Sequence, residues 1–71
     1  MIVYDKLWET MRKRGITKYS LIKNYHINES TIHRLRKNMP IRTTTIDRFC
    51  KILKCGVEDI CEYIEDDAEM E

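Results

Sequence analysis

The sequence predicts an all-α domain of five short helices, because three of its segments repeat one apolar spacing and no segment alternates convincingly with the two-residue period of a strand. The spacing i, i+3, i+4, i+7 puts apolar side chains on one face of a helix. It occurs in residues 4–11, 46–53 and 57–64, and two shorter amphipathic stretches lie between the first two of these segments. A chain of 71 residues has room for one domain with a small core.

The first expected helix is amphipathic and ends at a glycine. Its buried stripe consists of Tyr4, Leu7, Trp8 and Met11. We expect Trp8 to anchor this helix in the core, because it shares the stripe with Leu7 and Met11. The basic residues 12–14 suit the negative end of the helix dipole, and Gly15 suits a left-handed cap.

Residues 17–37 have the pattern of two helices joined by a tight turn. Thr17 can cap the first of them, whose apolar face is formed by Leu21, Ile22 and Tyr25. The turn is expected at residues 26–28, where Asn28 can cap the next helix. The helix over residues 28–37 has Ile32 and Leu35 as core anchors and basic residues on its other sides. This arrangement is typical of a helix-turn-helix, in which the second helix offers a cationic face to a groove.

The last two expected helices follow Pro40 and are separated by Gly56. Arg42 or Thr43 begins the fourth helix. Its apolar stripe consists of Ile46, Phe49, Cys50 and Leu53. The stripe of the fifth helix consists of Val57, Ile60, Cys61 and Ile64.

The net charge of +1 conceals a strong segregation of charge along the chain. Residues 1–54 hold 13 basic against 4 acidic residues, a net charge of +9, whereas residues 55–71 hold 8 acidic residues and no base. A basic body favours a polyanionic partner. We expect one domain over residues 1–64 and a disordered acidic tail over residues 65–71. The tail either keeps the protein soluble, which we favour, or competes with a nucleic acid for the basic face.

The sequence predicts no membrane span, no metal site and no cofactor. No apolar run approaches the roughly 20 residues of a spanning helix, and the first residues do not resemble a secretory signal, so a cytoplasmic location is expected. Cys50, Cys55 and Cys61 are then reduced thiols, and the absence of a C-x-x-C pair disfavours zinc. Cys50 and Cys61 fall on apolar faces, as small hydrophobic residues do. Cys55 is either an inert loop residue, which we favour, or a redox-sensing thiol.

The segments RGITKYSLI (14–22), INESTIHRL (27–35) and IDRFCKILKCGVEDI (46–60) occur in this order. Together they resemble the Cro/C1-type helix-turn-helix family of phage repressors and small bacterial transcriptional regulators. The resemblance covers residues 5 to about 64 and implies a compact five-helix, lambda-repressor-like DNA-binding domain. His26 stands where the family usually has a glycine with positive φ, a conformation that histidine tolerates better than most residues. Ile22 stands where the family has a small residue, which should push the two helices slightly apart.

The family pattern implies that the helix over residues 28–37 reads bases in the major groove. The residues carried over to this role are Glu29, Ser30, His33 and Arg34. A guanidinium fits O6 and N7 of guanine, so Arg34 is the leading candidate, worth ~1–3 kcal/mol of discrimination. Glu29 could accept a hydrogen bond from cytosine, and it could also stabilise the N-terminus of its own helix. Ser30 either bonds DNA or helps to cap the helix, and His33 either contacts DNA or merely faces solvent.

Contacts to the DNA backbone are expected at the helix boundaries. Lys18 begins the second helix, where main-chain amides and the helix dipole also favour phosphate. The other candidates are Thr31, Arg36, Lys37, Asn38, Arg42, Thr43 and Thr44. Such contacts position a protein on DNA without reading its sequence. For each single residue a solvated surface side chain is the alternative.

The sequence therefore predicts a sequence-specific, repressor-like transcriptional regulator that binds a double-stranded DNA operator as a homodimer. The family resemblance places the dimer contact on the helix over residues 57–64 and on the outer face of the helix over residues 46–53. The alternative is a protein-interaction module or antitoxin-like partner that acts through residues 57–64 and the acidic tail. Neither a membrane nor a small-molecule substrate is expected. An enzyme is disfavoured, because five short helices leave little room for a catalytic pocket.

Overall fold

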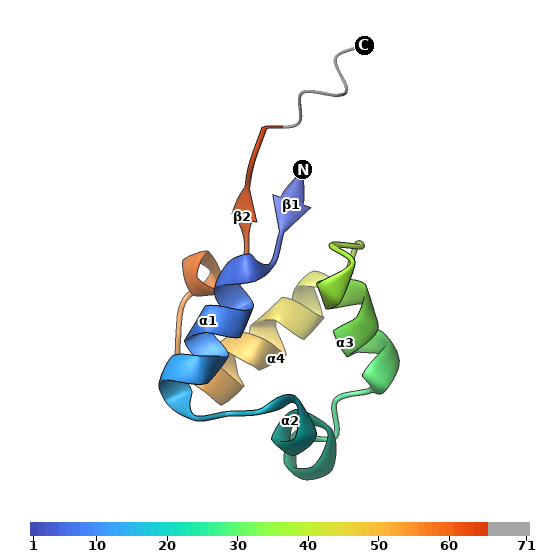
Figure 1. Cartoon of the computed structure of the whole chain (residues 1–71), viewed down its shortest axis with the longest axis vertical. Helices are drawn as coiled ribbons and strands as arrows, with labels where there is room; N and C mark the ends of the chain where they lie inside the picture. Colours follow the sequence, from blue (N-terminus) through green and yellow to red (C-terminus); the bar gives the residue numbers. More distant parts are fainter. Residues whose placement is uncertain (66–71) are drawn as a thin grey trace.

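The computed structural model describes residues 1–65 and consists of four α-helices with a small strand pair above them (Figure 1). The expected acidic tail, apart from Glu65, lies outside the described residues. The helices are α1 (Asp5–Arg14), α2 (Lys18–Tyr25), α3 (Glu29–Arg36) and α4 (Thr43–Leu53). The remaining elements are β1 (Ile2–Val3), the 3-10 turn η1 (Val57–Asp59) and β2 (Glu62–Tyr63). None of the helices within residues 1–65 has the length and apolar character that a bilayer crossing requires.

The helix ends lie where the local sequence signals put them. Gly15 (φ 72°) and His26 (φ 56°) end α1 and α2 in the left-handed conformation, as expected for both. The Thr17 hydroxyl accepts a hydrogen bond from the Ser20 amide at 3.1 Å, and the Ser20 hydroxyl oxygen accepts one from the Thr17 amide. Asn28 occupies the N-cap position of α3, but its side chain makes no capping hydrogen bond, contrary to expectation.

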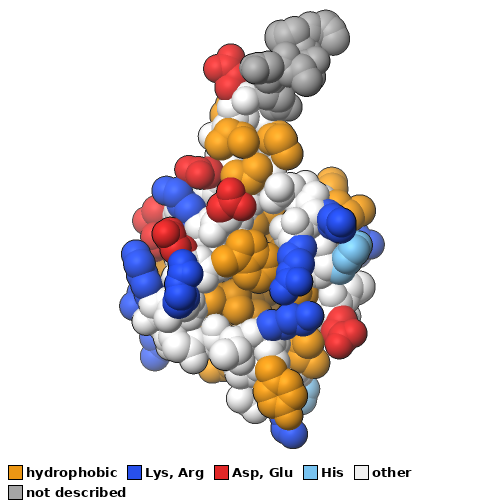
Figure 2. Space-filling view, viewed as in Figure 1, with side chains coloured by type: hydrophobic (Ala, Val, Ile, Leu, Met, Phe, Trp, Pro, Cys, Tyr) orange, Lys and Arg blue, Asp and Glu red, His pale blue; other side chains and the backbone are white. Residues whose placement is uncertain are grey.

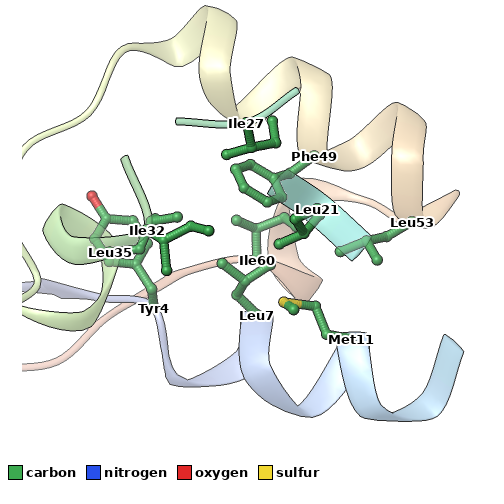
Figure 3. Close-up of a cluster of buried hydrophobic side chains, with 10 residues drawn as sticks. All are labelled: Tyr4, Leu7, Met11, Leu21, Ile27, Ile32, Leu35, Phe49, Leu53 and Ile60. Atoms are coloured by element: carbon green, nitrogen blue, oxygen red, sulfur yellow. The ribbon is translucent and has the colours of Figure 1, made fainter. Parts of the chain in front are cut away.

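The core lies between α1, α3 and α4, and it includes Ile27, the buried residue of the α2–α3 turn (Figure 3). Its buried side chains are Tyr4, Leu7, Met11, Leu21, Ile27, Ile32, Leu35, Phe49, Leu53 and Ile60. The prediction that Ile32 and Leu35 anchor α3 is confirmed, since they are 2% and 1% exposed. Trp8 is only half-buried and packs against the edge of the core, so the expectation that it lies inside is wrong. Ile22 is half-buried in the same way.

The expected fifth helix over residues 57–64 is wrong. Only Ile60 of its predicted stripe is fully buried, while Val57 (54% exposed) and Ile64 (43%) face outward, and Cys61 lies outside any helix. Helical structure stops after η1, where the Asp59 carboxylate accepts a hydrogen bond from the Gly56 amide at 3.3 Å. The apolar spacing over residues 57–64 therefore reflects one buried residue, Ile60, followed by an extended segment that contains β2.

The expectation that no sheet forms is also wrong. β1 and β2 are antiparallel, with Ile2 opposite Tyr63 and Val3 opposite Glu62. The Ile64 amide extends the pairing by donating to the Met1 carbonyl at 2.8 Å. The two ends of the described chain are thereby joined, and the side chains of Ile2 and Tyr63 are left exposed on the pair.

Candidate nucleic-acid interface

α2, its turn and α3 are held together as one unit by the core and by α4. Ile27 in the turn is buried, and its amide donates to the Leu21 carbonyl at 3.0 Å. Arg48 of α4 donates to the Tyr25 carbonyl at the end of α2 at 2.6 Å. Because the buried residues of α3 point inward, the opposite side of this helix faces solvent.

All four residues predicted to read bases lie on the exposed side of α3. They are Glu29, Ser30, His33 and Arg34. Within residues 1–65 none of these side chains forms a hydrogen bond or an ion pair. Their polar groups are therefore available to a partner, and α3 presents an exposed polar ridge.

A first hollow, of about 250 Å³, separates this ridge from the start of α4. It is lined by Ser30, Thr31, Arg34, Ile41, Arg42 and Thr45. The structure thus brings two predicted base-reading residues together with two predicted backbone-contacting residues. Two guanidinium groups and three hydroxyl groups around one hollow give it the character of an anion site. We call it the α3–α4 hollow.

A second hollow, of about 210 Å³, lies on the other side of the ridge, toward the start of α2. It is lined by Lys18, Glu29, Ile32, His33 and Arg36, and we call it the α2–α3 hollow. Lys18 is the first residue of α2, so one side of this hollow is a helix start, a place that favours an anion. The carboxylate of Glu29 is the one acidic group in the lining of either hollow.

Trp8 belongs to this surface, although the sequence favoured a place in the core over an exposed ring that stacks on a ligand. The Arg36 guanidinium carbon lies 5.7 Å from the centroid of the Trp8 ring, within the range of a cation–π contact. The ring of α1 therefore holds a cation at the C-terminal end of α3. The only signal in the sequence is that Trp8 lies beside Leu7 at the edge of its stripe, where an aromatic ring can be half exposed.

The remaining predicted backbone contacts lie outside both hollows. Lys37, Thr43 and Thr44 are exposed at the end of α3 and in the first turn of α4. Asn38 has a structural part, because its side-chain oxygen accepts a hydrogen bond from the Tyr4 amide at 3.1 Å. Its backbone also has positive φ (56°) after α3. This residue links the end of α3 to the start of α1.

The face shown in Figure 2 displays the charge segregation that the sequence indicates. Most of its Lys and Arg side chains lie over the helices, and most of its Asp and Glu side chains gather where the strand pair meets the helical body. Lys6 and Glu62 form an ion pair of 3.6 Å at that junction. Among residues 1–65 no three His, Cys, Asp or Glu side chains are grouped as a metal site would require.

One family model and one solved structure are similar to this chain over most of its length. A family model described as Cro/C1-type HTH DNA-binding domain matches residues 6–66. The crystal structure of transcriptional regulator VanUg, Form II, is similar with a TM-score of 0.81 and 29% sequence identity, over 92% of this chain and 87% of that chain. No curated protein matches the chain.

Proposed function

Because the chain belongs to the Cro/C1-type helix-turn-helix family of DNA-binding domains, we propose that this DNA-binding transcriptional regulator reads a short operator half-site with α3 in the major groove. The observation that carries the proposal is the exposed ridge of α3, whose polar side chains have no partner within residues 1–65 and which is flanked by the two polar hollows. A groove-reading helix needs such a ridge between two places that accept phosphates.

Base reading is assigned to the ridge itself. Arg34 offers two parallel donors to guanine, the commonest specific contact in the major groove. Glu29 and Ser30 lie in the first turn of α3, where side chains come closest to base edges. His33 lies one turn further along the same exposed side. Glu29 also disfavours phosphate in the α2–α3 hollow, so it restricts the register in which α3 can sit.

Phosphate binding is assigned to the cations that flank the ridge. Arg42, with Thr31 beside it, would take a phosphate at the α3–α4 hollow, and Lys18 would take one at the α2–α3 hollow. Arg36, which lines the same α2–α3 hollow and packs against Trp8, would contact a further phosphate. Supporting contacts come from Lys37, Asn38, Thr43 and Thr44.

We also propose that the protein acts as a repressor-like homodimer. A recognition helix of eight residues spans only a few base pairs, so two copies on a palindromic site gain both affinity and specificity. The exposed apolar side chains of the strand pair, Ile2 (46%), Tyr63 (68%) and Ile64 (43%), provide the contact surface in this proposal. In this proposal they replace, as the dimer contact, the helix that was expected over residues 57–64.

A salt titration tests the DNA-binding proposal. Operator duplexes are selected from random sequence, and their affinity is measured by fluorescence anisotropy over a range of salt concentrations. Each phosphate contact contributes about −0.9 to the slope of log affinity against log salt, so we expect a steep decline. A protein that bound no duplex even at low salt would act instead as an adaptor for other proteins, and the proposal would fail.

A further inference from the structure

Two cysteines meet across the turn that ends α4. Lys54 adopts the left-handed conformation (φ 53°), and the Cys55 amide donates to the Cys50 carbonyl at 3.1 Å. This hydrogen bond, between residues five apart, is the mark of a Schellman motif. The motif brings the residues at its two ends together, and here both residues carry thiols, whose ionisations influence each other.

The turn is held in place from α1. Arg14 donates to the Leu53 carbonyl at 2.8 Å and to the Lys54 carbonyl at 3.2 Å. Both cysteines are half-buried and pack against the core. The backbone hydrogen bond keeps the two residues close to each other, and a disulfide requires Cα atoms about 4.4–6.8 Å apart. We expect a bond between the sulfur atoms to form without displacing the backbone.

We propose that Cys50 and Cys55 are a modification site, at which a hydroperoxide converts the two thiols into a disulfide across the C-terminal turn of α4. The site lies at the opposite end of α4 from Arg42 and Thr43. It is thus separate from the residues assigned to DNA, and the inference does not depend on the proposed function.

The reaction has two steps. The Cys55 thiol loses its proton, and the thiolate, which the charge of the Arg14 guanidinium favours, attacks hydrogen peroxide and becomes a sulfenic acid. The released hydroxide takes up the proton and leaves as the first water. The sulfur of Cys50 then attacks the sulfur of Cys55 and displaces the hydroxyl group as the second water. In sum, two thiols lose two hydrogen atoms and two electrons, and one peroxide is reduced to two molecules of water.

We expect each thiol to react slowly with hydrogen peroxide, and the disulfide to close quickly once one thiol is oxidised. Burial is the main cause that raises the pKa of both, and Asp59 near Cys55 and Asp47 near Cys50 add to it, so little thiolate is present at neutral pH. After the first oxidation the turn holds the second sulfur nearby, so ring closure competes well against further oxidation. Cys61, which also lies near Cys50, is the competing partner.

Peptide mapping of the full chain tests the site. The protein is treated with hydrogen peroxide, its remaining thiols are alkylated, and it is digested with trypsin, which cuts after Lys51 and Lys54, between the two cysteines. We expect two peptides linked by a disulfide, in the wild type and in Cys61→Ser. The link should be lost in Cys55→Ser. A link that persists in Cys55→Ser and is lost in Cys61→Ser would identify Cys61 as the partner and overturn the proposal.

Thermal melting of the wild type supplies a second measurement that needs no variant. A disulfide formed without displacing the backbone should raise the melting temperature by a few degrees, and dithiothreitol should reverse the rise. A lower melting temperature after oxidation would show that the turn is distorted and would refute the geometry. So would thiols that stay free in the folded protein under treatment that oxidises the chain in urea.

Discussion

Arg34 and Lys18 both place a positive charge beside the exposed ridge of α3, yet their positions give them different tasks. Arg34 projects from the second turn of α3 and borders the α3–α4 hollow, where it can reach a base edge. Lys18 is the first residue of α2, where the helix start favours a phosphate. At the scale of single residues, position on a helix decides which part of DNA a cation can reach.

Replacing these two residues should separate base reading from backbone contact. Arg34→Ala should lose ~1–3 kcal/mol of preference at one base pair and leave the preference elsewhere unchanged. Lys18→Ala should weaken binding to all sequences alike and reduce the salt slope by about 1. Anisotropy titrations against operators that differ at single base pairs measure both effects. Identical behaviour of the two variants would contradict this division of roles.

The raised pKa values of Tyr4, Cys50 and Cys55 predict how stability depends on pH. Burial is the largest cause of each shift. The unfolded chain ionises these groups near their ordinary pKa values, 9.0 for the thiols and 10.0 for the phenol, whereas the folded protein keeps them protonated to higher pH. The contribution of these groups to the free energy of unfolding is therefore fully present below pH 9 and is lost as the pH rises further.

Urea unfolding under reducing conditions, from neutral pH to about pH 11, measures this loss. The double variant Cys50→Ala, Cys55→Ala is the control, and its stability should fall less steeply between pH 9 and pH 10, because the two thiols no longer titrate there. Equal slopes in the two proteins would show that the thiols are not the source.

Single residues also mark the limit of what the sequence could predict about the site. The exposed side of α3 follows from local spacing, because Ile32 and Leu35 define the buried side. The Trp8–Arg36 contact and the hydrogen bond from Tyr4 to Asn38 join residues 28 and 34 positions apart. No local pattern encodes such contacts, so the sequence predicts a DNA contact for Asn38 and gives no indication of its hydrogen bond with Tyr4.

At the scale of elements, the helices were predictable and the strands were not. Each helix carries its own stop signal, and three of them end at or just before a left-handed residue other than glycine: His26, Asn38 and Lys54. The segment after Gly56 has no comparable signal. Its structure depends on Thr10, whose hydroxyl donates to the Asp59 carbonyl at 2.9 Å, and on β1 at the other end of the chain. A two-residue strand is too short for its alternation to be visible.

The position of α3 depends on its two buried anchors. Leu35 is 1% exposed, so Leu35→Ala leaves a cavity and should cost ~2–5 kcal/mol of unfolding free energy, a large part of the total for a domain of this size. His33→Ala on the exposed side of the same helix is the control and should change the free energy by less than about 0.5 kcal/mol. Urea denaturation followed by circular dichroism measures both. Equal losses would mean that α3 does not pack as described.

At the scale of the whole molecule, the two ends of the described residues 1–65 meet at the strand pair, away from α2 (Figure 1). The pair carries Ile2 and Tyr63 as an exposed cross-strand contact, and Ile64 follows directly. A two-stranded sheet has two open edges and is marginally stable alone. A second copy that covered this apolar surface would leave the ridge of each α3 open, which is the arrangement that a palindromic operator requires.

This arrangement predicts how two exposed tyrosines should differ. Tyr63 on β2 and Tyr19 on α2 are equally accessible, at 68% and 67% exposure, so neither replacement should disturb the core. Tyr63→Lys introduces a charge at the proposed contact, and in a two-fold dimer it does so twice, so it should shift the protein from dimer to monomer. Tyr19→Lys should leave the dimer intact. Sedimentation velocity over a range of protein concentrations distinguishes the two species, and a wild type that remains monomeric while it binds a palindrome would rule out the dimer.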